Sequence, residues 1–229
     1  MATFIAEVPA EDVAPIRAEL ESRRLHNNPD RYVSGPGRTQ AFGIIKRWSY
    51  RPWVSRNCWM RPELWETLLA FAAKHVNIPW DAVQVNDSYQ SAPHKDKGNY
   101  GDSYIISFGD YEGGELVIDV EGTEQVVDTR LRGHHFNGSQ HLHWNKPMTG
   151  QKFSLVFFTF VYPRFWPKEK GFPTTSVIEK DGKKWLRISD CDGGVYDARG
   201  KDFITITEPT VKLDRVGKVS GFGGKAIAS

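Results

Sequence analysis

Residues 94–116 read HKDKGNYGDSYIISFGDYEGGEL, and this stretch decides how the rest of the chain is interpreted. Its first part is polar and carries His94, Asp96 and Asn99, whereas the part after it is apolar up to a Gly-rich turn. That pattern predicts a loop that enters a β-strand at 103–109 and then turns. In an extended chain alternate side chains share a face, so His94 and Asp96 could both reach one metal ion. A polar loop without a ligand is the other interpretation of such a pair.

From Ala82 onward the sequence is a run of short strands and turns. The predicted strands are 82–87, 103–109, 115–120, 124–128, 134–138 and 152–160, with further strands expected within 183–190, 193–200 and 202–208. Helices followed by a run of short strands indicate an α+β protein with a sandwich or jelly-roll core.

Two amphipathic helices are predicted before the strands, at 9–24 and 61–76, and Pro62 stands where a helix accepts proline. Their apolar faces consist of Val13, Ile16, Leu20, Leu64, Leu68, Phe71 and Ala72. The segment 26–61 is expected to be rich in loops. We therefore expect an N-terminal helical and basic region at 1–80, a jelly-roll core at 81–165, and a β-rich extension with a flexible tail at 166–229, all within one catalytic domain.

The segment 137–160, NGSQHLHWNKPMTGQKFSLVFFTF, offers the rest of a metal site. His141 and His143 alternate onto one face, so either could supply a third ligand. Two histidines and one carboxylate form the facial triad of non-haem Fe(II) oxygenases, which leaves coordination positions open. Lys152 and Ser154 share a face at the start of the apolar strand and could hold the far carboxylate of an oxo-acid co-substrate.

These motifs resemble the Fe(II)/2-oxoglutarate dioxygenase superfamily, and within it the TET/JBP branch, which oxidises the methyl group of 5-methylpyrimidines in DNA. The resemblance covers roughly residues 40–160. It is carried by His94-x-Asp96, the GDYEGGEL turn at 109–116, His143 and Lys152-x-Ser154, and for the branch by Asn99 and the 101–103 stretch. It implies a double-stranded β-helix core, a jelly roll of the cupin-like kind, with N-terminal supporting helices. It also implies Fe(II), 2-oxoglutarate and O2 as cofactor and co-substrates.

Within that resemblance the metal ligands are His94, Asp96 and His143, because His143 precedes Lys152 by the nine residues that the family motif suggests. Lys152 and Ser154 bind 2-oxoglutarate. The family commonly has arginine where this chain has Lys152, and lysine pairs with a carboxylate as a point charge rather than as a bidentate fork.

Substrate contacts follow from the same resemblance. Asn99 is expected to hydrogen-bond the extruded pyrimidine, whose Watson–Crick edge suits an amide. His141 is expected to face the base or to support the metal ligands, and Asn86 to orient the metal-binding loop. A plain turn role is the alternative for Asn86 and Asn99.

Charge is distributed unevenly along the chain. The net charge is +2, yet the segment 23–61 has nine Lys and Arg residues against one acid, Asp30. Cations interleaved with aromatic residues could contact phosphates and bases. The expected nucleic-acid contacts are Arg47, Arg51, Arg56 and Trp53, and an ordinary solvated loop is the alternative.

The remaining composition indicates a soluble, intracellular protein. Two distant cysteines imply no disulfide framework. The first residues lack the pattern of a secretory signal, and no apolar stretch is long enough to span a membrane. We expect the nucleus in a eukaryote and otherwise the cytoplasm. With DNA and 2-oxoglutarate as expected partners, two alternatives stay open: a hydroxylase of a protein side chain or small molecule, and a non-catalytic jelly-roll binding module.

Overall fold

The structure, a computed structural model, describes residues 1–25, 37–46, 52–160, 174–180, 182–189, 195–199 and 202–206. The chain divides into two compact units. The first comprises residues 1–40 and 70–161, and the second comprises residues 41–69 and 162–229. All of the predicted metal ligands belong to the first unit.

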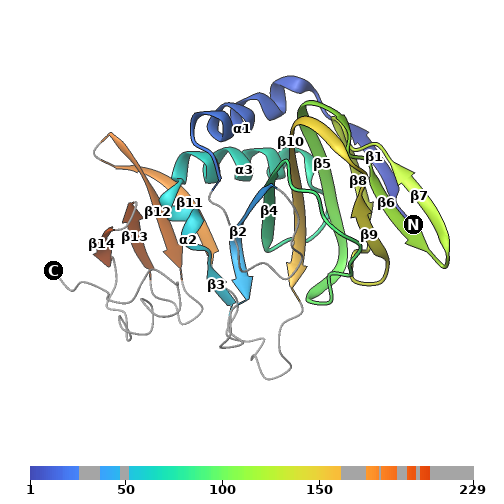
Figure 1. Ribbon diagram of the computed structural model, residues 1–229. Coiled ribbons are helices and arrows are strands. Elements are labelled where there is room, and N and C mark those ends of the chain that lie inside the picture. Colours follow the sequence, from blue (N-terminus) through green and yellow to red (C-terminus); the bar gives the residue numbers. More distant parts are fainter. Residues whose placement is uncertain are drawn as a thin grey trace. The chain divides into compact units, whose positions relative to one another are not determined.

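Two antiparallel sheets form the first unit (Figure 1). Their strands are β1 (Thr3–Glu7), β4 (Ala82–Asp87), β5 (Asn99–Gly113), β6 (Leu116–Val120), β7 (Thr123–Val127), β8 (Arg132–Phe136), β9 (Leu142–Asn145) and β10 (Met148–Phe160). The larger sheet has the order β1-β8-β5-β10-β4, and the smaller sheet has the order β7-β6-β9. The first residues of strand β2 (Arg38–Lys46) also belong to this unit and follow β4 in the order of strands.

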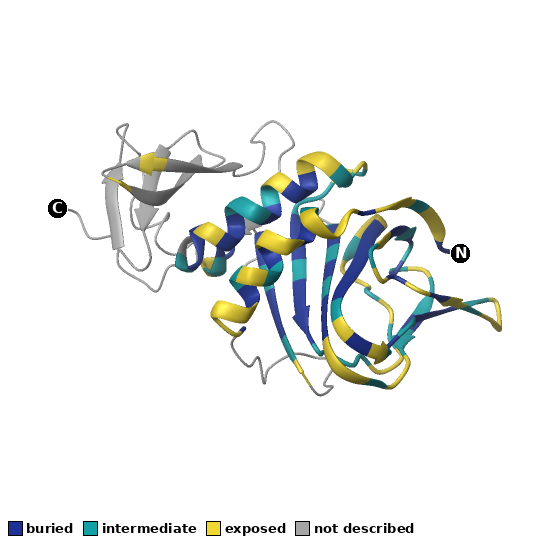
Figure 2. Ribbon diagram, turned by 90° about the horizontal axis from the view of Figure 1, so that it is seen from above, coloured by how far each residue is buried: buried dark blue, intermediate teal, exposed yellow. Residues whose placement is uncertain are grey.

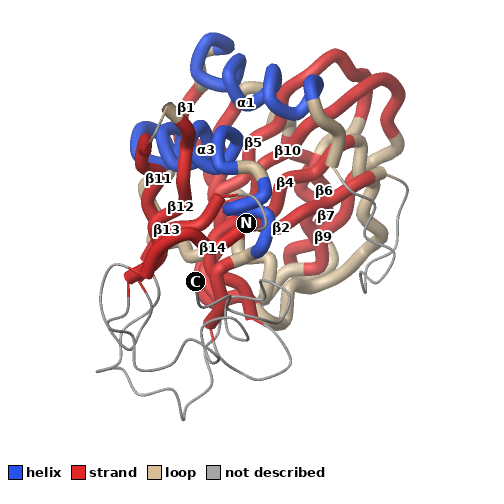
Figure 3. The backbone as a smooth tube through the Cα atoms, turned by 90° about the vertical axis from the view of Figure 1, so that its left-hand side faces the viewer, coloured by secondary structure: helices blue, strands red, loops and turns tan. Residues whose placement is uncertain are grey.

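An apolar core lies between these two sheets. Its buried cluster draws on both sheets, and Val156 of β10 packs against it; the cluster consists of Ala2, Ile105, Leu116, Ile118, Val127 and Phe136. The tube view in Figure 3 shows β5, β10 and β4 running together, with β6, β7 and β9 grouped as the second layer. Two facing antiparallel sheets with helices beside them agree with the predicted α+β fold class and its jelly-roll core.

The outer face of the larger sheet is covered by helices. Phe71, from helix α3 (Pro62–His75), stacks on Phe157 of β10 at 6.0 Å and meets Tyr104 of β5 edge to face at 6.5 Å. Helix α1 (Ala10–Ser22) joins α3 through Asp12, whose carboxylate accepts hydrogen bonds from Lys74 and His75.

Both helices bury the faces that the sequence predicts. All seven predicted positions are buried: Val13, Ile16, Leu20, Leu64, Leu68, Phe71 and Ala72. Figure 2 shows α1 exposed on its outward side and buried on the opposite side. Helix α3 begins at Pro62, as predicted. Burial of one apolar face, rather than intrinsic propensity, provides most of the stability of such helices.

In the second unit, β2 pairs with β3 (Pro52–Val54), and the short helix α2 (Arg56–Met60) follows. Four strands make a separate antiparallel sheet in the order β11-β12-β13-β14: β11 (Thr174–Lys180), β12 (Lys183–Ser189), β13 (Val195–Arg199) and β14 (Asp202–Ile206). No helix in the described ranges is both long and apolar enough to cross a membrane.

The structure corrects the sequence prediction at several short elements. In its described part, the segment expected to be rich in loops contains β2, β3 and α2, and strands β1, β9 and β11 were not predicted. Strand β9 has only four residues and none of the apolar run that identifies a strand from sequence. It exists because it pairs with β6, a contact that local patterns do not reveal.

Candidate metal centre

His94 and His143 are brought together by a pair of backbone hydrogen bonds. The amide of His94 donates to the carbonyl of His143 at 3.1 Å, and the amide of His143 donates to the carbonyl of His94 at 2.9 Å. This isolated antiparallel bridge places the two residues directly opposite each other. Strand β9 is held in turn by β6, where Ile118 pairs with His143.

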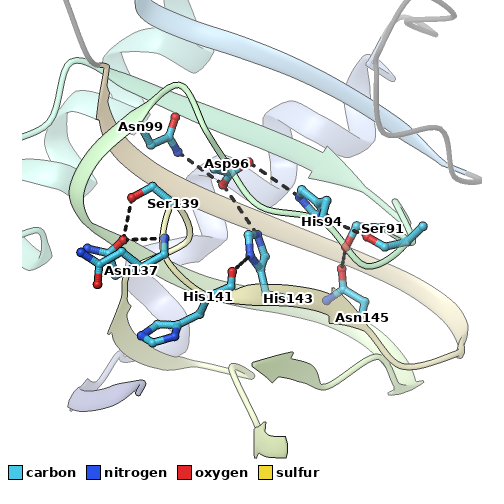
Figure 4. Close-up of polar contacts among 11 residues, drawn as sticks. Ser91, His94, Asp96, Asn99, Asn137, Ser139, His141, His143 and Asn145 are labelled. Carbon is cyan, nitrogen blue, oxygen red and sulfur yellow. Dashed lines mark hydrogen bonds and ion pairs between the residues drawn. The ribbon is translucent and has the colours of Figure 1, made fainter. Parts of the chain in front are cut away.

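Asp96 completes a compact group with the two histidines. Its Oδ1 lies 3.7 Å from Nε2 of His94, and its Oδ2 lies 3.6 Å from Nε2 of His143. One ligand atom from each of the three residues lies within 4.8 Å of the others. Because metal–ligand bonds of this type are about 2.1 Å long, small side-chain rotations would bring all three atoms onto one ion. Figure 4 shows the three side chains pointing toward one another.

Hydrogen bonds hold both imidazoles in the tautomer that a metal requires. Nδ1 of His94 donates to the carbonyl of Ala92 at 2.7 Å, and Nδ1 of His143 donates to the carbonyl of His141 at 3.1 Å. A carbonyl can only accept, so the proton of each neutral ring is on Nδ1 and the lone pair of Nε2 faces Asp96. Burial lowers the pKa of His143, which favours the neutral, ligating ring. The donor set therefore fits Fe(II).

The loop around Asp96 is fixed from two sides. The Asp96 amide donates to the carbonyl of Gly138 at 2.9 Å, and Nδ2 of Asn99 donates to Asp96 Oδ2 at 3.3 Å. Asn99 thus lies beside the metal group, at the first residue of β5. The side-chain carbonyl of Asn99 and the second hydrogen of its amide are not engaged by the hydrogen bond to Asp96.

Lys152 is buried on the inner side of the larger sheet, with 4% of its surface exposed. It shares a face of β10 with Ser154 and Val156, and Val156 packs against the core between the sheets. Its ammonium donates to the carbonyl of Gly114. Burial lowers the pKa of Lys152 to about 8. A buried cation on the inner face is suited to bind a carboxylate.

Ser154 and Asn86 face each other across β10 and β4. Nδ2 of Asn86 donates to Oγ of Ser154 at 3.1 Å, and Oδ1 of Asn86 accepts from the hydroxyl of Thr39 at 2.6 Å. The geometry thus connects Asn86 to Ser154, the residue expected to bind the co-substrate. Thr39 was not predicted, because it lies between Arg38 and Gln40 in a segment that was expected to be rich in loops.

The remaining residues predicted to contact the substrate are one histidine and four residues of the segment 23–61. The ring of His141 points away from the metal group (Figure 4), and its backbone carbonyl supports His143. Arg56 is exposed at the start of α2. Arg47 and Arg51 lie outside the described residues, as does the side chain of Trp53.

Gly138 was also missed, and its importance is steric. A Cβ atom at this position would lie 3.0 Å from Oδ2 of Asp96, 3.1 Å from Cε1 of His143 and 3.2 Å from Cε2 of Phe136. All three separations are tighter than ordinary van der Waals contact. The backbone of Gly138 does not have a positive φ, so the space it leaves, not its conformation, explains the glycine.

We expect Gly138→Ala to lower the affinity for a divalent metal by about tenfold, because the new methyl group displaces the Asp96 carboxylate and the His143 ring. Titration with Co(II), followed by its visible absorption, measures this affinity. Gly98→Ala is the matched control, because a Cβ at Gly98 meets nothing within 4 Å. Equal affinities in both variants would contradict the steric argument.

Comparisons with known proteins bear on the fold. No protein-family model and no curated protein sequence matches the chain. Among solved structures, NgTET1 in complex with 5mC DNA is similar with a TM-score of 0.52 and 16% identity, over 69% of this chain and 72% of that one. An oxidoreductase of the 2OG-Fe(II) oxygenase family from Burkholderia pseudomallei gives a TM-score of 0.47 and 18% identity, over 69% and 82% of the two chains. A Pseudomonas putida prolyl-4-hydroxylase gives 0.47 and 15%, over 70% and 92%.

At 16% identity the likeness to NgTET1 establishes the fold alone. The chain shares its double-stranded β-helix with NgTET1, as the sequence resemblance predicted at the level of fold.

Proposed function

We propose that the chain is a Fe(II)- and 2-oxoglutarate-dependent dioxygenase that oxidises the methyl group of a 5-methylpyrimidine in DNA, with 5-methylcytosine as the favoured base. The observation that carries the proposal is the group of His94, Asp96 and His143, with both Nε2 atoms directed at the carboxylate. The buried ammonium of Lys152, on the inner face of the same unit, is the second element that such an enzyme needs.

In this mechanism the chain holds and orients the reactants. When bound, Fe(II) with 2-oxoglutarate and O2 supplies the oxidation of a C–H bond, coupled to decarboxylation of the oxo-acid to succinate. His94, Asp96 and His143 would hold the metal, and three protein ligands would leave it able to bind the co-substrates. Lys152 pairs with the far carboxylate of 2-oxoglutarate and fixes its orientation.

Three features support a DNA substrate. Asn99 holds an amide beside the metal group, where it can pair with the edge of an extruded base. Lys95 and Lys97 alternate with the ligands, are exposed, and have no ion-pair partner among the residues that the structure describes. Tyr100 follows with 70% of its surface exposed and offers a ring for stacking. The similar fold of NgTET1, solved with 5mC DNA, agrees with this choice.

The test is analysis of the products. The protein is incubated with methylated duplex DNA, Fe(II) and 2-oxoglutarate, and the digested nucleosides are measured by mass spectrometry. We expect 5-hydroxymethylcytosine and an equivalent amount of succinate with wild type, and neither product with Asp96→Ala. Asn99→Ala loses its hydrogen bond to Asp96, so its metal affinity should fall as well, and it is compared with wild type at saturating metal, where it should oxidise less DNA. Succinate without an oxidised nucleoside would direct the search to a protein side chain or a small molecule.

A further inference from the structure

Four polar side chains form a hydrogen-bonded chain along the inner faces of β2, β4 and β10. Nε2 of Gln84 donates to Oγ1 of Thr39, Thr39 donates to Oδ1 of Asn86 at 2.6 Å, and Nδ2 of Asn86 donates to Oγ of Ser154 at 3.1 Å. Gln84 and Asn86 lie opposite Val156 and Ser154 in the register of β4 and β10. Since Val156 packs against the core between the sheets, the chain of hydrogen bonds lies on that same inner side.

The donors and acceptors give this row of hydrogen bonds one direction. Thr39 donates to Asn86 at 2.6 Å, within the range of an O–H donor, and Asn86 donates to Ser154 at 3.1 Å, within the range of an N–H donor. The carbonyl of Asn86 therefore faces Thr39, and its NH2 group faces Ser154. The Gln84 amide donates to the Thr39 oxygen, which leaves the Thr39 hydrogen for Asn86.

This direction leaves the hydroxyl hydrogen of Ser154, the last group in the row of hydrogen bonds, available for another acceptor. The oxygen of Ser154 already accepts from Asn86, so its hydroxyl hydrogen is directed elsewhere, and no acceptor for it is found among the described residues. Lys152 lies two residues away on the same face of β10, at a spacing of about 6.6 Å along the strand. A carboxylate between them would accept from both the ammonium and the hydroxyl.

We propose that Thr39 is a positioning residue for 2-oxoglutarate: it fixes the Asn86 amide so that Ser154 donates its hydrogen to the far carboxylate beside Lys152. Without Thr39 the amide of Asn86 is free to rotate and present its carbonyl to Ser154. The serine hydrogen would then turn back to Asn86 and leave the co-substrate. Thr39 itself, with 2% of its surface exposed, does not need to touch 2-oxoglutarate. This inference rests on the proposed function.

The test compares Thr39→Val, which keeps the shape and removes the hydroxyl, with Thr39→Ser, which keeps the hydroxyl. We expect the valine variant to bind 2-oxoglutarate about three- to tenfold more weakly, as for the loss of one buried hydrogen bond, and the serine variant to bind it like wild type. Isothermal titration of the Mn(II)-loaded protein under anaerobic conditions measures this affinity without turnover. The KM for 2-oxoglutarate should rise by the same factor while kcat and Mn(II) affinity stay unchanged.

Coupling to Ser154 provides the decisive comparison. Ser154→Ala lacks the hydroxyl that Thr39 is proposed to orient through Asn86. Adding Thr39→Val to this variant should therefore weaken the binding of 2-oxoglutarate no further. Thr39→Ala replaces the valine variant if the latter loses its cooperative melting transition. If the two substitutions weaken 2-oxoglutarate binding additively, or if the valine variant binds it as tightly as wild type, the proposed role of Thr39 is wrong. Failure of wild type to bind 2-oxoglutarate would overturn the proposed function itself, so the two failures are distinguishable.

Discussion

Replacing His143 with alanine is expected to reduce the affinity for Fe(II) by at least about 100-fold and to remove succinate formation with it. His143 supplies one of only two imidazoles in the group, and its Nε2 lies 3.6 Å from Asp96 Oδ2. Its loss leaves one imidazole and one carboxylate, a pair that does not form the facial triad. Iron content after gel filtration and Co(II) titration measure binding, and succinate formation measures turnover.

His141→Ala is the matched control, because both histidines are in the same short segment and only one ring faces the metal group. The ring of His141 points away from Asp96, and its support for His143 comes from the backbone carbonyl, which alanine retains. We therefore expect normal metal binding in this variant. Loss of the metal in His141→Ala, or retained turnover in His143→Ala, would show that the ligands are assigned incorrectly.

The part of the site that could be predicted from sequence is the part determined by local geometry. Lys152 and Ser154 are two residues apart in β10, and strand alternation is enough to put them on one side. His94 and Asp96 have the same spacing and do meet, although Asp96 lies in a turn, where the amide of Lys97 donates to the carbonyl of Lys95, and not in a strand. The two amphipathic helices could also be predicted from the spacing of residues within one segment. Their apolar spacing predicted the buried faces of α1 and α3, and all of the predicted positions are buried.

The rest of the site depends on contacts between distant segments. The choice between His141 and His143 is made by the backbone bridge to His94, which alternation within one strand does not specify. Gly138 matters because its missing side chain leaves room for Asp96 and His143. Thr39 matters because β2 lies beside β4, and its own segment was expected to be a loop. Neither residue carries a signal in a single sequence.

The position of Lys152 depends on the Gly-Gly turn between β5 and β6. A Cβ at Gly113 would lie 2.4 Å from the carbonyl oxygen of Pro147, and a Cβ at Gly114 would lie 3.3 Å from Cδ of Lys152. Both glycines have positive φ values, 72° and 73°. Only glycine adopts this conformation at so little cost, and it lets the Gly114 carbonyl meet the Lys152 ammonium. The Gly-Gly turn thus helps to fix the position of the Lys152 ammonium.

Lys152→Ala should raise the Kd for 2-oxoglutarate by about 100-fold, because it leaves the carboxylate of the co-substrate in a buried site without its cation. Iron content should stay near that of wild type, since Lys152 is not among the three residues of the metal group. Anaerobic titration of the Mn(II)-loaded protein measures the co-substrate affinity, and metal analysis provides the control. Unchanged affinity in this variant would place the oxo-acid elsewhere.

The pH dependence of the same affinity tests the charge itself. Burial lowers the pKa of Lys152 to about 8, so the free protein loses the ammonium form as the pH rises through this value. Only the ammonium pairs with the carboxylate, and the Kd for 2-oxoglutarate should therefore be constant below pH 8 and rise by about tenfold per pH unit above it. In Lys152→Arg the guanidinium stays charged throughout, so this rise should disappear while other effects of alkaline pH remain. The same slope in both proteins would mean that a different group controls binding, and a flat profile in wild type would mean that the lysine keeps its proton well above pH 8.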